Sequence, residues 1–154
     1  NLKFEGEYLN GERGGKGKEY YDNGSLKFEG EYLKGKRWNG KGYNKNSNFD
    51  FEINNGNGKG KEYYDNDILE FEGEYLNGEK NGKGKEYYSN GNLRFEGEYL
   101  NGKKNRKGKE YHNGHLEFEG EYLNGEKWNG EEKQYDFDGR FLHEIKYING
   151  KANK

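Results

Sequence analysis

The chain has 154 residues, of which only 27% are hydrophobic and 36% are charged, so it cannot build the thick aliphatic core of an ordinary globular domain. Its net charge of −2, with lysine and glutamate interleaved, provides no basis for binding nucleic acid or an anionic membrane, and the lack of cysteine excludes disulfides. An aromatic fraction of 17% and regularly spaced glycines argue against disorder and predict thin, repeated aromatic packing.

The tetrapeptide Gly-Glu-Tyr-Leu recurs and defines a repeat. It begins at Gly6, Gly30, Gly73, Gly97 and Gly120, and degenerate copies at 49–53 and 145–150 fill the long gap and close the chain. We therefore expect a single repeat domain of six units and the start of a seventh, in what we interpret as a fragment of a longer chain. The expected boundaries are 2–24, 25–46, 47–67, 68–91, 92–114, 115–139 and 140–154.

Each unit is predicted to form two short antiparallel strands. In the unit that contains Phe71, apolar residues and glycine alternate with glutamates along 69–75, which is typical of a half-buried strand. Asn77-Gly78 predicts a tight turn, 83–88 a returning strand and 89–91 a second turn. Glycine or Asn-Gly interrupts every stretch long enough for a helix. The predicted fold is all-β, an elongated single-layer antiparallel β-meander of tandem hairpins.

The two faces of this sheet should differ in chemistry. We expect the strand glycines, such as Gly73 and Gly84, to let aromatic rings lie across bare backbone of the neighbouring strand. Gly73→Val should therefore destabilise the fold more than Glu74→Ala. Residues of the opposite parity, such as Glu72 and Lys83, are predicted to pair across strands on a solvated outer face.

The pattern Phe4-x-Gly6-x-Tyr8-x-x-Gly11-x-x-x-Gly15-x-Gly17 resembles the MORN repeat (membrane occupation and recognition nexus), and the same frame fits 71–84. The repeat spacing looks most like bacterial, giant-virus and protist variants. The resemblance implies a twisted antiparallel sheet, often curved into a half-pipe, that acts as a scaffold, tether or docking platform and holds a helix or peptide of a partner. Phospholipid binding has been proposed for the family, but this charge pattern does not support it.

Several positions depart from this frame. Trp38 and Trp128 lie in hairpin loops that look one residue longer than the loop of the clean unit. Each precedes a degenerate copy in which the strand glycine looks replaced. Ring packing on backbone is in doubt at four expected glycine positions, which are occupied by Phe51, Arg106, Glu132 and Ile145.

No motif predicts catalysis or metal binding. His112 and His115 flank a turn, and the only other histidine, His143, is distant in the sequence, so a metal site lacks ligands. The segment 136–139 lacks most ligands of a calcium loop. The glutamates recur in every unit, whereas a catalytic pair must be unique. We therefore expect a chain that is not an enzyme, with no cofactor and no metal.

The phenylalanine row, four residues before each repeated tyrosine, is interpreted as core, while the tyrosine row can be either core or an accessible groove. An accessible aromatic row with polar rims is a recognition surface. The predicted function is a non-catalytic protein–protein interaction scaffold that binds a partner helix or extended segment along the aromatic face. The predicted contact residues are Tyr8, Tyr32, Trp38, Tyr75, Tyr99, Tyr122 and Trp128.

Two other functions stay open at this point. The Asn-Gly and Tyr-Tyr phrases loosely resemble clostridial cell-wall-binding repeats, which favours a carbohydrate or cell-surface module, although those repeats lack the Gly-x-x-x-Gly-x-Gly spacing. The chain can also be an accessory region of a larger enzyme. We expect a protein partner, self-association through the terminal strands, no nucleic acid, no membrane and a cytoplasmic location.

Overall fold

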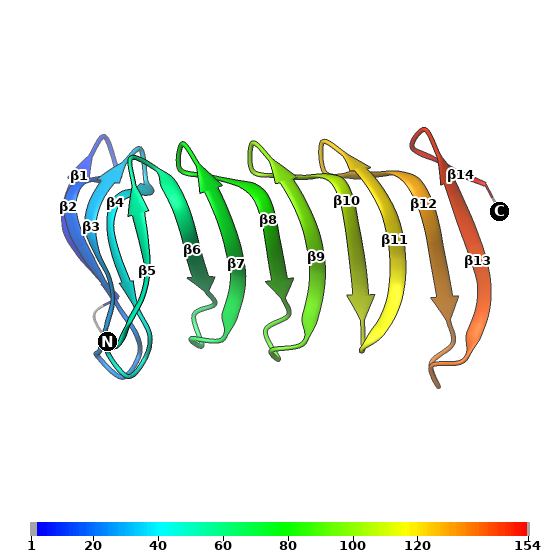
Figure 1. Ribbon diagram of the computed structural model, residues 1–154. Coiled ribbons are helices and arrows are strands. Elements are labelled where there is room, and N and C mark those ends of the chain that lie inside the picture. Colours follow the sequence, from blue (N-terminus) through cyan, green and yellow to red (C-terminus); the bar gives the residue numbers. More distant parts are fainter. Residues whose placement is uncertain (1–2, 154) are drawn as a thin grey trace. The chain divides into compact units, whose positions relative to one another are not determined.

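The structure is a computed structural model that describes residues 3–153, and every regular element in this range is a β-strand. The strands follow one another in chain order in an antiparallel sheet, which confirms the predicted β-meander (Figure 1). Their bounds are β1 Phe4–Leu9, β2 Glu12–Tyr20, β3 Leu26–Leu33, β4 Lys36–Tyr43, β5 Phe49–Asn54, β6 Asn57–Tyr63, β7 Leu69–Leu76, β8 Glu79–Tyr87, β9 Leu93–Leu100, β10 Lys103–His112, β11 His115–Leu123, β12 Glu126–Tyr135, β13 Phe141–Ile148 and β14 Lys151–Asn153.

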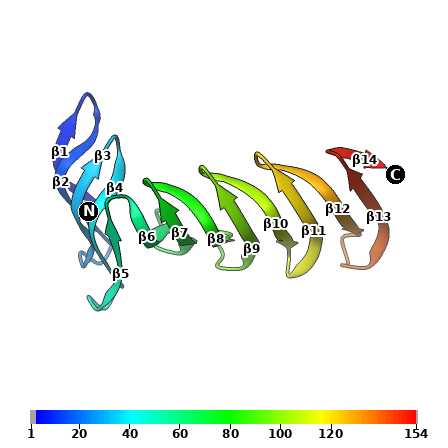
Figure 2. The same ribbon diagram turned by 45° about the horizontal axis from the view of Figure 1, so that its top comes forward.

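The chain divides into two compact units, unit 1 at residues 1–79 and unit 2 at residues 80–154. Unit 1 holds β1 to β7 and unit 2 holds β9 to β14, while β8 begins at the boundary. Within unit 2 the long strands bend along their length in both views (Figures 1 and 2).

Tight two-residue turns close the hairpins at one end of the strands. In the turn at Asn77-Gly78, φ is +52° and +75°, which is the positive-φ geometry predicted from the sequence. The turns also dock on one another, because the glycine amide of a turn donates to a carbonyl of the preceding hairpin. The bonds are Gly56 to Trp38 at 2.7 Å and Gly78 to Gly56 at 2.8 Å in unit 1, and Gly102 to Lys80 at 2.9 Å, Gly125 to Lys104 at 2.8 Å and Gly150 to Trp128 at 2.8 Å in unit 2.

A row of glycines crosses the strands of each unit. The facing glycines are Gly6, Gly17, Gly30 and Gly40 in unit 1, and Gly97, Gly108, Gly120 and Gly130 in unit 2. A Cβ atom added to Gly108 would lie 2.5 Å from the Phe95 ring and 3.1 Å from the Tyr122 ring. The predicted packing of rings on bare backbone is therefore confirmed at this equivalent of Gly84.

The aromatic core follows the same rows. Four phenylalanines of the repeated position, Phe28, Phe71, Phe95 and Phe118, are buried, as predicted. Three tyrosines of the adjacent row are buried as well, so at these positions the row is core, which is one of the two alternatives that the sequence left open. They are Tyr32, Tyr99 and Tyr122.

The tyrosines are buried because each ring is covered by its neighbours along the row. Tyr122 makes edge-on contacts with Phe95 and Phe118, with ring centroids 5.4 Å and 5.2 Å apart. Tyr32 is held in the same way between Phe4 and Phe28, at 5.3 Å and 5.8 Å. A single layer can therefore seal its own aromatic face where large rings alternate with glycine.

The outer face carries the predicted cross-strand charge pairs. Lys16 faces Glu31 in unit 1, and Lys109 faces Glu119 in unit 2, where their charged atoms lie 3.1 Å apart. Such pairs contribute roughly 0.2–1 kcal/mol each, so this face supports the strand pairing without forming a second core.

The degenerate hairpins replace the strand glycine at the predicted positions. In unit 1, Ile53 faces Gly58 beside the turn as Tyr8 faces Arg13, so Ile53 holds the tyrosine position and Phe51 the glycine position. In unit 2, Tyr147 faces Ala152 in the same manner, so Ile145 holds the glycine position. Tyr147 also packs edge-on against Phe118, at 5.7 Å between ring centroids, as a tyrosine of the row does.

The β-bulge of the second strand differs between hairpins. Gly17, which faces the first strand of its own hairpin, follows the turn glycine Gly11 by six positions, whereas Gly40 follows Gly35 by five. Toward the next hairpin the count is one residue longer, as predicted, because Gly40 faces Ile53 whereas Gly82, only four positions after Gly78, faces Tyr99.

Arg106 and Glu132 are the other two residues expected at glycine positions, and their environments differ. Arg106 has φ of +59° at a position where Gly15 and Gly82 have +71° and +85°, so it does occupy an expected glycine position. Glu132 faces Phe118 as Glu110 faces Phe95. It stands at a regular glutamate position toward its own hairpin, while toward the next strand it faces Ile145, where a regular hairpin has a glycine, as Gly108 faces Gly120.

Candidate functional site

The aromatic face also carries charged side chains. In four hairpins, a cation from the start of the second strand lies over the phenylalanine ring of the same hairpin, which is a favourable cation–π arrangement. The distances to the ring centroid are 4.2 Å for Arg13 over Phe4, 4.7 Å for Arg37 over Phe28, 4.2 Å for Lys104 over Phe95 and 4.9 Å for Lys127 over Phe118.

These cations alternate with glutamates that stand two positions after the row glycine. In unit 2, Glu110 binds Lys104 of its own hairpin at 2.9 Å and Lys127 of the following hairpin at 3.5 Å. In unit 1, Glu19 binds Arg13 at 3.3 Å and Arg37 at 2.8 Å in the same way. We call this arrangement the charge ladder. Its members are the cations Arg13, Arg37, Lys104 and Lys127 and the glutamates Glu19, Glu62, Glu86, Glu110 and Glu132.

Sequence reasoning missed the charge ladder, although a signal was present. Counting by twos from Gly84 places Glu86 on the aromatic face, together with the glycine and Tyr88. The prediction had assigned the glutamates and lysines to the outer face as a class. Glu86 lies an even number of positions from the row glycine Gly84 and belongs to the aromatic face. Lys83 and Lys85 lie an odd number of positions from it and belong to the outer face.

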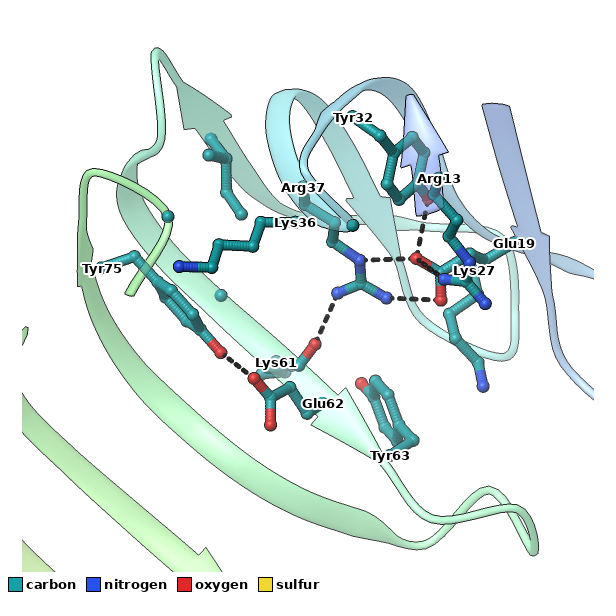
Figure 3. Close-up of a pocket in the computed structure, with 14 residues that line it drawn as sticks. Arg13, Glu19, Lys27, Tyr32, Lys36, Arg37, Lys61, Glu62, Tyr63 and Tyr75 are labelled. Carbon is teal, nitrogen blue, oxygen red and sulfur yellow. Dashed lines mark hydrogen bonds and ion pairs between the residues drawn. The ribbon is translucent and has the colours of Figure 1, made fainter. Parts of the chain in front are cut away.

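Arg37 and Glu19 form the most enclosed pair of the charge ladder. The Arg37 Nε and Nη2 atoms donate to the Glu19 carboxylate at 2.8 Å and 2.9 Å, and Nη1 donates to the Lys61 carbonyl at 2.7 Å (Figure 3). The Tyr32 hydroxyl also donates to Glu19, at 2.7 Å. A bidentate pair with these additional bonds fixes the orientation of both side chains.

Burial and pairing act in opposite directions on Glu19. Burial alone would raise the pKa of its carboxyl group, but the charge and hydrogen bonds of Arg37, with Tyr32 and Arg13, lower that pKa to about 2. Burial likewise opposes the charge on Arg37, and Glu19 raises the pKa of the guanidinium above its ordinary value. Both groups therefore stay charged at neutral pH.

Unit 1 has a cavity of about 320 Å³ on its aromatic face, built from side chains of β2 to β7 (Figure 3). Arg37, Ile53 and Tyr75 are among the residues that line it, and the Tyr75 hydroxyl donates to Glu62 at 2.6 Å. Lys36 also lines it, and its amine binds Glu79 at 2.7 Å. The cavity combines fixed polar groups with aromatic and aliphatic walls, which is the usual composition of a binding pocket.

The structure brings only some of the predicted contact residues together. Tyr32 and Tyr75 both line the cavity, whereas Tyr8 lies outside it, with 62% of its surface exposed. In unit 2, Tyr99 and Tyr122 are buried in the aromatic row.

The two tryptophans lie in strands β4 and β12 and are partly buried. Each ring packs against the turn of the following hairpin. A Cβ atom on Gly56 would lie 2.6 Å from the Trp38 ring, and one on Gly150 would lie 3.1 Å from the Trp128 ring. The tryptophans therefore support the turns, and only part of each side chain is available to a partner.

His112 and His115 face each other across their turn, and both are exposed. Among residues 3–153, no group of three or more histidine, cysteine or acidic side chains could hold a metal ion. The same described residues include no helix long and apolar enough to cross a membrane.

Comparison with protein families identifies the repeat. The model of the MORN repeat matches residues 4–26, 71–93 and 95–115, and that of a MORN repeat variant matches 56–77. A search of curated proteins found no match. MORN repeats are generally non-catalytic and generally take part in protein–protein or membrane interactions. The matches together cover more than half of the sequence, and with the hairpin meander they show that the chain belongs to the MORN repeat family.

Proposed function

We propose that this chain is a non-catalytic docking platform that binds a helix or an extended segment of a protein partner on its aromatic face. The observation that supports this function is the cavity in unit 1. The aromatic rings seal much of that face, and the cavity is a place where polar and apolar side chains of several strands converge.

The charges around the cavity favour a peptide segment of a protein as the partner over a polyanion. Arg37 is paired with Glu19, Lys61 with Asp50 at 2.8 Å and Lys36 with Glu79 at 2.7 Å. Arg13 and Lys27 also line the cavity and are paired with Glu19 and Asp67, so each lining cation has a carboxylate partner and the site has no large excess of one sign. A peptide can match such a surface with its own side chains and backbone, whereas a polyanion gains from net positive charge.

The expected contacts differ in their contribution. Tyr75 and Lys36 line the cavity and can meet a partner directly. Trp38 presents part of its ring beside the same turns. The buried Tyr32 shapes the floor of the site. We expect partner affinity to depend on the first three more than on Tyr99 or Tyr122.

A displayed library of random peptides, selected against the whole chain, tests this function. We expect peptides whose binding falls at least tenfold, about 1.4 kcal/mol, with Tyr75→Leu or Lys36→Ala. Leu100→Ala serves as the control, because Leu100 is exposed and lies in unit 2. Circular dichroism verifies that each variant is folded. Selection that yields no specific binder, or binders that are indifferent to both cavity variants, contradicts the proposal.

A further inference from the structure

The third hairpin, β5–β6, differs from the others in the length of its second strand. Gly60 faces Gly73 and so belongs to the glycine row, but it follows the turn glycine Gly56 by only four positions. In the first hairpin the same interval, from Gly11 to Gly17, is six. A ladder cation stands two positions after its turn glycine, as Arg13 does where it faces Tyr8 and Lys104 does where it faces Tyr99. In the third hairpin Gly58 stands at this position and faces Ile53, so the hairpin has no ladder cation.

The residues between Gly56 and Gly60 cannot replace that cation. They are Asn57, Gly58 and Lys59. Lys59 faces Glu74 and is exposed, as its equivalents on the outer face are. The missing ladder cation is thus a property of the sequence of this hairpin.

The missing cation changes the surroundings of the next tyrosine along the row. Where a ladder cation is present, it also lies near the tyrosine of the following hairpin, at 5.8 Å for Arg13 and Tyr32 and at 5.8 Å for Lys104 and Tyr122. Those two tyrosines are only 4% and 3% exposed. Tyr75, which follows the third hairpin, is not fully buried and lines the cavity.

The remaining parts of a ladder position are present beside Tyr75. The Tyr75 hydroxyl donates to Glu62 at 2.6 Å, just as the Tyr32 hydroxyl donates to Glu19 at 2.7 Å. A ladder glutamate can bind two cations, since Glu19 binds both Arg13 and Arg37. The geometry of Glu62 and Tyr75 therefore suits a cation at the place where the third hairpin supplies none.

We infer that the cavity beside Tyr75 and Glu62 receives a lysine or arginine side chain of the protein partner, which completes the charge ladder. This inference rests on the proposed docking function and specifies the partner's anchor. The ammonium or guanidinium group binds the Glu62 carboxylate and the face of Tyr75, and its aliphatic stem lies along Ile53.

The cations that already line the cavity do not prevent this binding. Arg37 shares the Glu19 carboxylate with Arg13, and Lys36 is paired with Glu79 at 2.7 Å. The other two lining cations, Lys27 and Lys61, are paired with Asp67 and Asp50. The ladder itself places cations of successive hairpins along one row, with a glutamate between them. The partner's cation would have the same relation to Arg37.

Nuclear magnetic resonance titration of the whole chain with N-acetyl-arginine amide tests the site directly. We expect saturable shifts at Tyr75 and Glu62, and none with N-acetyl-norleucine amide, which has a stem but no charge. Glu62→Gln should weaken binding about tenfold, since a hydrogen bond to a charged group is lost. Glu110→Gln is the matched control, because Glu110 already binds two ladder cations.

A graft provides the second variant. Replacing Asn57-Gly58 with Glu-Lys-Asn-Gly, copied from residues 79–82, gives the third hairpin the length of the fourth and a lysine two positions after the turn glycine, where Lys104 stands in its hairpin. We expect the folded graft to lose arginine binding. Unchanged binding to the graft, equal shifts with the norleucine probe or no shift at Tyr75 would each overturn the inference. Displayed peptides that need Tyr75 but contain no basic residue would overturn it as well, while they would uphold the docking function.

Discussion

Single atoms limit what the strand glycines can be replaced by. A Cβ atom at Gly108 would lie 2.5 Å from the Phe95 ring, and that ring is itself fully buried. The ring cannot move without disturbing Tyr122, which contacts it at 5.4 Å between centroids. Glycine is therefore required here for close packing, in contrast to the turn glycines, which are required for their positive φ.

We predict that Gly108→Ala lowers the free energy of unfolding by about 2–3 kcal/mol, because the methyl group overpacks the site. Lys107→Ala is the control, since Lys107 is exposed on the outer face, and it should change the free energy by less than about 0.5 kcal/mol. Urea denaturation of both variants measures the difference. Equal midpoints would contradict the packing model. The corresponding comparison of Gly73→Val with Glu74→Ala stays a prediction.

The ionisation of Glu19 should make the free energy of unfolding depend on pH in the acid range. Its pKa of about 2 in the folded chain lies below the ordinary value of 4.5, so its stabilising effect is complete above about pH 4.5 and is lost as the pH falls towards 2. Glu19→Gln should cost on the order of 2–3 kcal/mol at pH 7, because it leaves Arg37 buried without its carboxylate. The gap between wild type and variant should close as the pH falls from 4.5 to 2.

Urea denaturation across this pH range measures that gap. The matched control is Glu52→Gln, since Glu52 is exposed on the outer face opposite Lys41. The difference in unfolding free energy between wild type and Glu52→Gln should stay within about 0.5 kcal/mol over the whole pH range. A Glu19→Gln gap that does not change with pH would show that the Arg37 pair does not stabilise the fold in the way described.

At the residue scale, alternation of side chains predicted the glycine row and the phenylalanine core correctly. It did not predict the burial of Tyr32, Tyr99 and Tyr122, because the cover comes from rings of adjacent hairpins and no single unit contains both partners. The alternation of side chains was also not used to identify the ladder glutamates. They are the same residue type as the glutamates of the outer face and differ from them only in lying at the alternate positions of the strand.

At the scale of elements, the loop between β6 and β7 of unit 1 is hydrogen-bonded to the loop between β2 and β3. Asp67, in the loop between β6 and β7, accepts a hydrogen bond from the amide of Asp22 at 2.8 Å and one from Lys27 at 3.4 Å. Both Asp67 and Lys27 are buried. Burial would raise the pKa of Asp67, but these bonds and the Lys27 charge lower it. This clasp joins the loop after β6 to the loop after β2.

The backbone of Asp67 indicates that the clasp is stabilising. Its φ is +61°, at the loop position where Gly24 and Gly91 have +83° and +86°. A residue with a side chain costs about 1 kcal/mol or more in this region. The carboxylate contacts must offset that cost, because glycine would fit the loop without strain.

We predict that Asp67→Gly destabilises unit 1 by about 1–2 kcal/mol, because the lost ion pair and hydrogen bond outweigh the relieved strain. Ser47→Gly is the matched control, since Ser47 is exposed and has φ of +63° at the same loop position. It should be neutral or stabilise by up to about 1 kcal/mol, because the strain relieved at positive φ is partly offset by the entropy that glycine adds to the unfolded chain. Thermal denaturation gives both values. If the two variants shift stability in the same direction, the clasp has no stabilising role.

At the element scale, the sequence predicted the hairpins and their turns but not the length of each bulge. A bulge adds residues to one strand only, so the count from turn to glycine row varies between six, five and four for Gly17, Gly40 and Gly60. The absence of the ladder cation in the third hairpin follows from its register, in which Gly58 faces Ile53 as Arg13 faces Tyr8.

For the whole molecule, stability should be distributed as in other repeat proteins, where each hairpin depends mainly on its neighbours. We predict that Gly108→Ala raises the hydrogen-exchange rates of amides in β9, β10 and β11 and leaves those of β2 and β3 nearly unchanged. Mass spectrometry of exchanged peptides measures both regions. An equal increase in both would show that the chain opens as one cooperative body.

The docked turns have a further consequence, for the chemical lifetime of the protein. Asn-Gly is the sequence at which a glycine nitrogen attacks the preceding asparagine and closes a succinimide, the first step of deamidation. In the turns at Gly56, Gly78, Gly102, Gly125 and Gly150, that nitrogen donates its proton to the preceding hairpin. Attack requires the turn to leave its neighbour. Deamidation at these sites should therefore be slow in the folded chain, and the mass it adds would record how often each hairpin has opened.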